Sequence, residues 1–455
     1  MRRANAVESG GKGKDTRHRA QRASGNRGIM ESMSIDVPDM RTLLEFVPTA
    51  HYGDTLATPP RMDVPAPFTP ASVEPRGGAL HISSVLPALS AAIGAPVETT
   101  VHHDAGTLQR ALGIPQARAA VVVLVDGLGY WNLAMRLAHA NYLRALMKEP
   151  INQRPISTCA PSTTTAAMAT FGTGTCPGLT AMTGYTQRNA RTGVMSQLIQ
   201  FRDAEPPEEL QREPTAFELL ASRGVRVTSV GLKRFKSSPL TRATLRGAHY
   251  LGFDTPLARV RAAAQSAQEP GLTYLYLPDV DKTGHAEGWE SEDWVVQFEK
   301  IDDQLDTLRR LAPRGTAIVV VADHGMVAAD PAERIDIALD PQLTQDVAMV
   351  GGEPRSVMLY AGEGCDVAAL AERWRTRLAG KAWVRTKDEA VNAGLFGPVS
   401  AHTREVLGDV IVQAARNVTL VDSRTQTEGA MSMPGVHGSQ TMLEMDVPCI
   451  IDMVD

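Results

Sequence analysis

Apolar positions along the chain alternate between two spacings from about residue 79 onward. Residues 119–127, AAVVVLVDG, form a continuous β-branched run that is typical of a strand buried on both faces of a parallel sheet. Residues 130–149 follow with apolar residues at helical spacing. Strands alternating with helices predict an α/β fold, a doubly wound and mostly parallel sheet flanked by helices. The downstream units are a helix and strand over 216–231, a strand over 271–281, a helix over 294–312 and a strand over 316–326.

Three stretches depart from this alternation. Residues 1–35 begin polar and Gly-rich, with too few large apolar side chains to order themselves, so they predict a disordered tail. Residues 36–78 are Pro-rich and predict an irregular surface arm. Residues 79–455 then form the predicted α/β domain, within which 345–425 has the pattern of a small α+β insertion or lid.

Composition and charge narrow the class of protein. The 455 residues are 43% hydrophobic and carry a net charge of −5, which is ordinary for a globular protein. Basic residues concentrate near the start, so the remainder is acidic and argues against a surface that binds nucleic acid. No apolar run reaches membrane-spanning length. We therefore predict a cytoplasmic protein without nucleic-acid or membrane partners, whose scattered cysteines are free thiols: Cys159, Cys176, Cys365 and Cys449.

Acidic side chains follow three of the predicted strands. Asp126 ends the first strand, Asp279 and Asp281 end the second, and Asp323 ends the third. Ligands of such sheets bind beyond the carboxyl ends of the strands, so these carboxylates are expected at one edge. Histidines accompany them at His285 in DKTGH, His324 in ADHGM and His437 in GVHGS. On a helical turn Asp281 and His285 would share a face, whereas in a loop Gly284 would let the backbone fold back.

Carboxylate and imidazole are ligands of zinc and similar divalent ions. Six such side chains are too many for one tetrahedral ion but suit two ions with three ligands each, an arrangement that supports phosphoryl transfer. A hydroxyl placed between two cations would be deprotonated near neutral pH and become a nucleophile. The stretch CAPSTTTAAMATFGTG at 159–174 offers Thr163, Thr164 and Thr165 for this role.

The order of these motifs resembles the alkaline phosphatase superfamily, and within it the type I phosphodiesterase/nucleotide pyrophosphatase family. The resemblance covers about residues 117–440. It implies that Thr164, three residues after Pro161 and ahead of Thr173-Gly174, is the nucleophile and also contacts the first ion. It further implies two divalent ions, expected to be zinc, with Asp126, Asp323 and His324 as ligands of the ion that activates the nucleophile, and Asp281, His285 and His437 as ligands of the other.

One position departs from the family pattern. Related nucleotide phosphodiesterases carry an Asn that contacts the phosphoryl oxygen, whereas here Tyr185 stands at about that position and Asn189 a turn later. A phenol could donate the same hydrogen bond. Candidates for a phosphate-binding cation are Arg355, Arg404, Lys233 and Arg234, although each is rather expected to be a solvated surface charge.

The predicted function is metal-dependent hydrolysis of a small-molecule phosphoric ester, of the phosphodiesterase or nucleotide pyrophosphatase type, through a covalent phosphothreonine. A sulfatase is excluded because CAPST has Thr163 where that branch needs an Arg. The alternatives are a phosphonoacetate hydrolase-like or phosphomonoesterase activity. A more distant alternative, a non-catalytic metal-binding protein, is disfavoured because structural zinc sites are usually closed and often Cys-rich.

Overall fold

The computed structural model describes residues 35–55 and 63–455. All of the predicted tail except its last residue, and residues 56–62 of the predicted arm, lie outside the described residues. In the part of the chain that is described, no helix is long and apolar enough to cross a membrane. All four cysteines are free thiols, as predicted.

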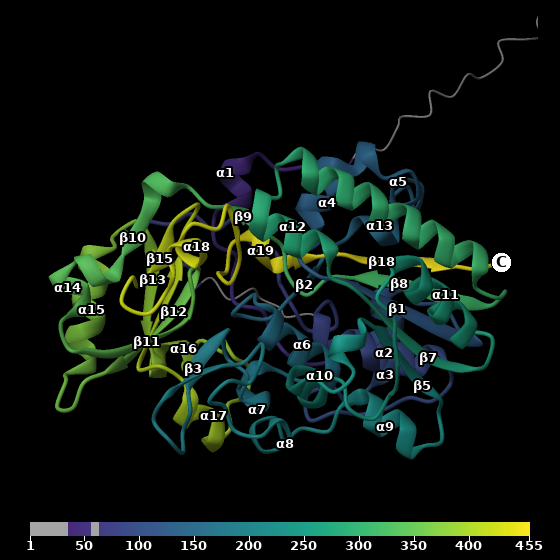
Figure 1. Ribbon diagram of the computed structural model, residues 1–455, viewed down its shortest axis with the longest axis horizontal. Helices are drawn as coiled ribbons and strands as arrows, with labels where there is room; N and C mark the ends of the chain where they lie inside the picture. Colours follow the sequence, from purple (N-terminus) through teal and green to yellow (C-terminus); the bar gives the residue numbers. More distant parts are fainter. Residues whose placement is uncertain (1–34, 56–62) are drawn as a thin grey trace, which may run out of the picture. The chain divides into compact units, whose positions relative to one another are not determined.

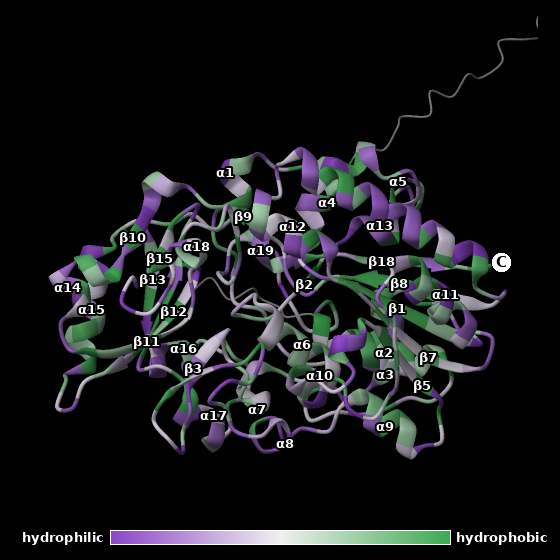
Figure 2. Ribbon diagram, in the orientation of Figure 1, coloured by the Kyte–Doolittle hydropathy of each residue, from purple (hydrophilic) through white to green (hydrophobic). Residues whose placement is uncertain are grey.

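The core of the molecule is a six-stranded sheet in the order β18-β8-β1-β7-β5-β6 (Figure 1). All neighbouring pairs are parallel except β18 with β8, which confirms the predicted mostly parallel sheet. Every residue of β1 is buried, because helices cover both faces, and the strands are coloured mainly as hydrophobic in Figure 2. The strands are β1 (Ala119–Val125), β5 (Val227–Gly231), β6 (His249–Gly252), β7 (Gly271–Leu277), β8 (Thr316–Val321) and β18 (Cys449–Met453).

Helices lie on both sides of this sheet, with α13 along one side and α2 and α9 on the other (Figure 1). The long helices are α2 (Val85–Ala92), α3 (Ala105–Leu112), α6 (Thr164–Thr173), α9 (Ala216–Ser222), α11 (Pro256–Ser266), α12 (Asp279–Glu287) and α13 (Glu292–Leu311). Shorter ones are α7 (Pro177–Thr180), α8 (Pro207–Leu210), α10 (Pro239–Thr244), α14 (Pro341–Thr344), α18 (Glu428–Met431) and α19 (Met442–Met445).

The stretch 130–149, predicted from its helical spacing, is helical but interrupted. The chain forms α4 (Tyr130–Arg136), a 3₁₀ turn and α5 (Asn141–Leu146). The cause is a tertiary contact, since the Asp302 carboxylate of α13 accepts hydrogen bonds from the backbone N–H groups of Tyr142 and Leu143 at 2.9 and 2.8 Å. A carboxylate on these free N–H groups starts a new helix, which the local apolar spacing does not reveal.

Residues 345–425 contain the expected small α+β unit. Its antiparallel sheet has the order β11-β12-β14-β13 and packs a core of its own around Leu359 and Trp374. We call this unit the insertion; its role as a lid stays a prediction. Its elements are β11 (Val347–Glu353), β12 (Ser356–Ala361), α15 (Val367–Arg377), β13 (Ala382–Thr386), α16 (Lys387–Asn392), α17 (Ala401–Val406) and β14 (Val410–Ala414).

The described part of the N-terminal arm is largely irregular, with one short helix, α1 (Met40–Leu43). Phe46 and Val47 are nonetheless buried, and the Phe46 ring packs 5.5 Å from the ring of Trp383 in the insertion. Among the described residues, four short strand pairs complete the fold: β2 (Ile156–Ser157) with β17 (Asp446–Val447), β3 (Thr186–Arg188) with β4 (Met195–Gln197), β9 (Val327–Ala328) with β16 (Gly435–Val436), and β10 (Arg334–Asp336) with β15 (Thr419–Val421).

Candidate metal centre

Two neighbouring strands of the large sheet deliver the first set of acidic and imidazole side chains. Asp126 directly follows β1, and Asp323 and His324 follow β8, which pairs with β1 in parallel register. Asp323 Oδ1 accepts hydrogen bonds from the backbone N–H of Gly127 at 3.0 Å and of His324 at 3.2 Å. The sheet register therefore places these three side chains, which we call group one, side by side and buried.

A helix supplies two members of the second set. Asp281 and His285 lie one turn apart on α12, with Asp281 Oδ1 3.4 Å from His285 Nε2, so the helical alternative of the two sequence-based readings is correct. Asp279 is not part of this set, because β7 ends at Leu277 and the Asp279 carboxylate lies 3.4 Å from Arg259 on α11. The expectation that Asp279 and Asp281 end a strand over 271–281 is thus corrected: β7 ends at Leu277, and both residues lie on α12.

Gly127 allows the two sets to approach each other. It has φ +71°, and a Cβ at this position would lie 2.9 Å from Cβ of Asp281. Any larger residue would therefore be strained and would push α12 away from the end of β1.

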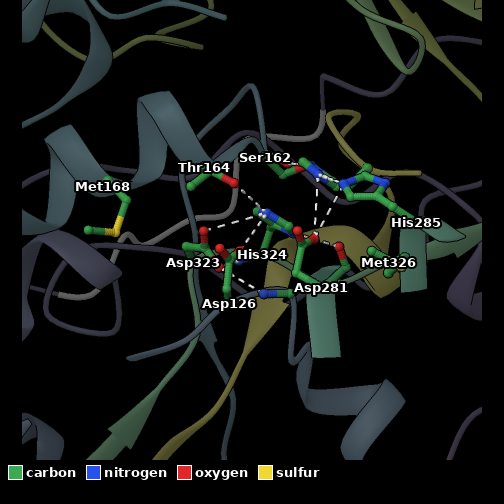
Figure 3. Close-up of polar contacts among 12 residues, drawn as sticks. Asp126, Ser162, Thr164, Met168, Asp281, His285, Asp323, His324 and Met326 are labelled. Carbon is green, nitrogen blue, oxygen red and sulfur yellow. Dashed lines mark hydrogen bonds and ion pairs between the residues drawn. The ribbon is translucent and has the colours of Figure 1, made fainter. Parts of the chain in front are cut away.

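His437 completes the second set, which we call group two. It follows β16, which pairs with β9 just after the His324 loop. Its ring stacks on that of His324 with centroids 3.5 Å apart, and its Nε2 lies 3.2 Å from His285 Nε2. The donor atoms within each group all lie within 4.8 Å of one another. The structure thus brings together all six side chains named from the sequence, in two groups of three: Asp126, Asp323 and His324, and Asp281, His285 and His437. Figure 3 labels all of them except His437.

The chemistry of these donors fits cations. Each histidine has Nδ1 at a backbone carbonyl, which leaves Nε2 as the acceptor that faces the cluster. The three Nδ1 contacts are His285 to Gly435 O at 2.8 Å, His324 to Gly325 O at 3.0 Å and His437 to Ser162 O at 2.9 Å.

One oxygen of each carboxylate is also buried without a hydrogen-bond partner among the described residues: Asp126 Oδ1, Asp281 Oδ1 and Asp323 Oδ2. Buried carboxylate oxygens of this kind are costly unless a cation or a donor compensates them. The two groups therefore fit a pair of divalent ions.

The electrostatics of the site also favour bound cations. Burial raises the pKa of Asp126 well above its usual value, and the carboxylates of Asp323 and Asp281 raise it further, although a hydrogen bond from the Tyr276 hydroxyl opposes the shift. Burial also lowers the pKa of His437 far below its usual value, with His324 and His285 lowering it further. Protonation of His437 is therefore a poor way to balance the negative charge of the carboxylates. Bound cations would balance it and stabilise the ionised carboxylates.

The three threonines of the 159–174 stretch have different environments. Thr164 is the first residue of α6, is partly exposed, and has Oγ1 3.1 Å from His324 Nε2 of group one (Figure 3). Thr165 is buried and donates from Oγ1 to Gly184 O at 2.8 Å. Thr163 is the buried residue that precedes the helix. Of the three hydroxyls, only that of Thr164 has a recorded contact with a member of either group among the described residues.

Among the described residues, the side chain of Tyr185 makes no hydrogen bond to either group. Its side chain is 38% exposed, and its hydroxyl accepts from Gln197 Nε2 at 2.6 Å. Asn189 Oδ1 accepts from the backbone N–H of Arg191, so it stabilises its own loop.

The basic candidates also have partners. Arg355, expected either to bind phosphate or to be solvated, is instead fully buried in an ion pair with Glu444. Arg404 pairs at the surface with Asp388, and Lys233 Nζ lies 3.0 Å from Asp254. Arg234 places its guanidinium over the ring of Phe235.

Sequence reasoning missed three residues that support the site. Tyr276, on β7, donates to Asp126, and its place near the end of a strand beside acid-terminated strands was an available signal. Ser162 and Glu444 contact the His437 loop. Neither has a local pattern that marks it, because both act through contacts distant in sequence.

Comparisons with known proteins agree with the fold. No curated protein matches the chain. The fold is similar to that of phosphonoacetate hydrolase from Sinorhizobium meliloti 1021 in complex with phosphonoformate, with a TM-score of 0.57 and 21% identity over 74% of this chain and 90% of that one. It is also similar to murine ectonucleotide pyrophosphatase/phosphodiesterase 5 in complex with AMP, with a TM-score of 0.57 and 15% identity over 73% of this chain and 87% of that one.

Residues 120–440 match the family described as type I phosphodiesterase/nucleotide pyrophosphatase. This stretch runs from β1 to the loop after His437, so it spans both groups and the insertion. The chain therefore belongs to the type I phosphodiesterase/nucleotide pyrophosphatase family of phosphoric ester hydrolases.

Proposed function

We propose that this enzyme hydrolyses phosphodiester or pyrophosphate bonds of a small molecule, with Thr164 as nucleophile beside two divalent cations, most suitably zinc. The observation that carries this proposal is the position of Thr164 Oγ1, 3.1 Å from Nε2 of His324 and thus at the edge of group one. Group two lies next to it, since the His437 ring stacks on that of His324. Among the described residues, a partly exposed hydroxyl and two neighbouring ligand groups coincide only here.

The chain's own residues define the steps. Group one and group two would each hold one ion, and the bound ions would favour the deprotonated form of the Thr164 hydroxyl and stabilise charge on the phosphoryl oxygens. Thr164 Oγ1 attacks phosphorus, the bond from phosphorus to the leaving oxygen breaks, and a phosphothreonine forms. Water then cleaves the bond between Thr164 and phosphorus and restores the hydroxyl.

Two features of the scaffold assist this chemistry. Thr164 begins the ten-residue helix α6, so the free N–H groups and the positive end of the helix dipole face the incoming phosphoryl oxygens. Tyr276 fixes the orientation of the Asp126 carboxylate through its hydrogen bond. Catalysis would then come mainly from positioning and electrostatics.

A second candidate is hydrolysis of a phosphonate that carries a further acidic group. It is favoured by the basic turn Lys233–Phe235, which follows β5 at the carboxyl edge of the sheet. The Phe235 ring lies 6.1 Å from that of Tyr276, whose hydroxyl contacts Asp126. The turn therefore stands at the sheet edge that carries Asp126, and Lys233 or Arg234 would have to leave Asp254 or the Phe235 ring to meet a second anionic substituent of a substrate.

The deciding experiment is a substrate panel on protein stripped with a chelator and then reloaded with zinc. We expect the stripped enzyme to be inactive and the reloaded one to cleave bis(p-nitrophenyl) phosphate faster than p-nitrophenyl phosphate or phosphonoacetate. A preference for phosphonoacetate would select the second candidate. Full activity in the metal-free protein would contradict the proposal, and zinc binding without turnover on any ester would identify a non-catalytic metal-binding protein.

A further inference from the structure

A fully buried ion pair joins the insertion to the loop that carries His437. Arg355 lies in the hairpin between β11 and β12, and its guanidinium donates to both carboxylate oxygens of Glu444, from Nε at 3.0 Å and from Nη2 at 2.8 Å. Both side chains have zero exposure. Nη1 donates to Val418 O at 2.6 Å, so the insertion itself holds the guanidinium in place.

Glu444 contacts the loops of both ligand groups. Its Oε1 accepts from the backbone N–H of Ser439 at 2.9 Å, two residues after His437 of group two. Its main-chain carbonyl accepts from the N–H of Gly325 at 2.9 Å, one residue after His324 of group one. One residue thus fixes the spacing between the two loops.

The same loop is bonded to the stretch that carries the nucleophile. Ser162, two residues before Thr164, donates from its N–H to Gly438 O at 3.1 Å and from Oγ to Ser439 O at 2.6 Å. Its carbonyl lies 2.9 Å from Nδ1 of His437. Figure 3 shows Ser162 beside Thr164. A series of hydrogen bonds therefore runs from the insertion to Ser162, two residues before the nucleophile.

We propose that Arg355 and Glu444 are positioning residues, which set the His437 loop so that group two binds its cation and faces Thr164. The inference rests on the proposed function and gives the insertion a role in metal binding. In this role the insertion is a fixed part of the metal centre, because its hairpin is bonded to the ligand loops through a pair with no exposure.

A purely stabilising role explains the pair less well. Replacing a buried ion pair by apolar residues of similar volume is often neutral or stabilising, because the desolvation of two charges offsets their attraction. What apolar residues cannot supply is an acceptor for the Ser439 N–H. The specific property of the pair is therefore its orientation of the His437 loop.

The test compares two double variants that both remove the ion pair. Arg355→Met/Glu444→Leu also removes the acceptor for Ser439, whereas Arg355→Met/Glu444→Gln keeps an oxygen at that position. We measure zinc stoichiometry and affinity by competition with a chromophoric chelator, together with the Tm of the metal-free protein. Loss of outer-sphere partners commonly weakens metal binding ~10–100-fold, so we expect that loss for one of the two ions in the Leu variant and a partial recovery in the Gln variant.

The matched control is Arg76→Met/Asp446→Leu. This pair is also largely buried, but Asp446 accepts from Trp131 Nε1 and contacts neither ligand loop through its side chain. We expect its zinc affinity to equal that of the wild type. Equal affinities in the control and in the Leu variant would overturn the inference.

Ser162→Ala tests the same route without altering a charge, and so decides the matter even if the Leu variant does not fold. We expect a smaller but measurable loss of zinc affinity, because one hydrogen bond to Ser439 is removed. Unchanged affinity would overturn the inference. If the wild type binds two zinc ions and hydrolyses substrate, but the variants bind zinc with the same affinity, only this inference is refuted. If the wild type binds no zinc, the proposed function itself is refuted.

Discussion

Group one and group two contain the same kinds of ligands but are built differently. Asp323 and His324 of group one are fully buried and follow a strand in the middle of the large sheet. In group two, the side chains of Asp281 and His285 are 16% and 29% exposed and stand on a helix, while His437 stands on a loop. The geometry of group one is therefore fixed by strand register, and that of group two by loop contacts. The difference teaches that changes in the loops should affect group two alone.

The largest effect is expected from Thr164→Ala, which separates chemistry from metal binding in both groups. Loss of a nucleophile commonly costs ~10³-fold or more, so kcat/KM for an aryl phosphodiester should fall at least that far. Zinc content should stay at two ions per chain, because the six side chains are untouched. Retained turnover, with loss instead in Thr163→Ala or Thr165→Ala, would reassign the nucleophile.

The difference in construction between group one and group two is tested by Asp323→Asn and His285→Ala. Asp323→Asn should lower zinc occupancy and rate together, and should also lower the Tm, because a neutral amide oxygen accepts the two backbone N–H groups at the sheet edge more weakly than the carboxylate does. His285→Ala should lose one ion with a ~10–100-fold fall in rate and little change in Tm, since the residue is partly exposed. Zinc counted by atomic emission and thermal melts provide the readout. Equal losses of Tm would show that the two groups are not built differently.

How far the sequence predicted this site depends on the range of each contact. Asp126 and Asp323 were identifiable because an acid after a buried apolar run lies at the ligand-binding edge of a parallel sheet. His437 was singled out as one of three histidines in Gly-flanked loops, but its assignment to a ligand set came only from the family resemblance, since a histidine between small residues is a weak signal by itself. Arg355 was placed wrongly, because its partner Glu444 is 89 residues away and no spacing rule links them.

The same limit explains the errors in the fold. The apolar spacing over 130–149 is helical throughout, but Asp302 of a distant helix starts a second helix inside it. The six-stranded sheet was predictable in kind because β1 and β8 are continuous runs of mostly β-branched residues, separated along the chain by helical spacing. The insertion was predictable as a change of pattern, whereas its attachment to the His437 loop depends on buried side-chain pairs.

A smaller effect is expected from Gly438→Ala, which perturbs group two through its loop. Gly438 has φ +132°, and a Cβ there would lie 2.5 Å from Cγ of Glu353. The resulting strain, ~1–3 kcal/mol, should displace His437 and lower zinc affinity at one site while the other stays filled. Gly429→Ala is the matched control, because no atom lies within 4 Å of a Cβ at that position. Loss of both ions in Gly438→Ala would contradict the independence of the two groups.

The smallest effect on catalysis is expected from Glu353→Gln, which alters the pH dependence of stability beside group two. Burial raises the pKa of Glu353 to about 8, with the charge of Glu444 adding to the shift and a hydrogen bond from the Tyr185 N–H opposing it. The folded protein thus keeps a proton that the unfolded chain releases above a pKa of 4.5. Its stability should therefore fall as the pH rises from about 4.5 to about 8, and be flat outside that window.

Glutamine cannot ionise but still accepts from the Tyr185 N–H, so the variant should lose this slope. Relative to wild type it should gain stability on the order of 1 kcal/mol per pH unit across the window, seen as a growing difference in Tm between pH 5 and pH 8. Glu363→Gln, at an exposed position of the insertion, is the control and should leave the slope unchanged. If the Tm difference between Glu353→Gln and the wild type did not grow with pH, Glu353 would be ionised in the folded protein. A cation or a proton donor would then have to reach this edge of group two.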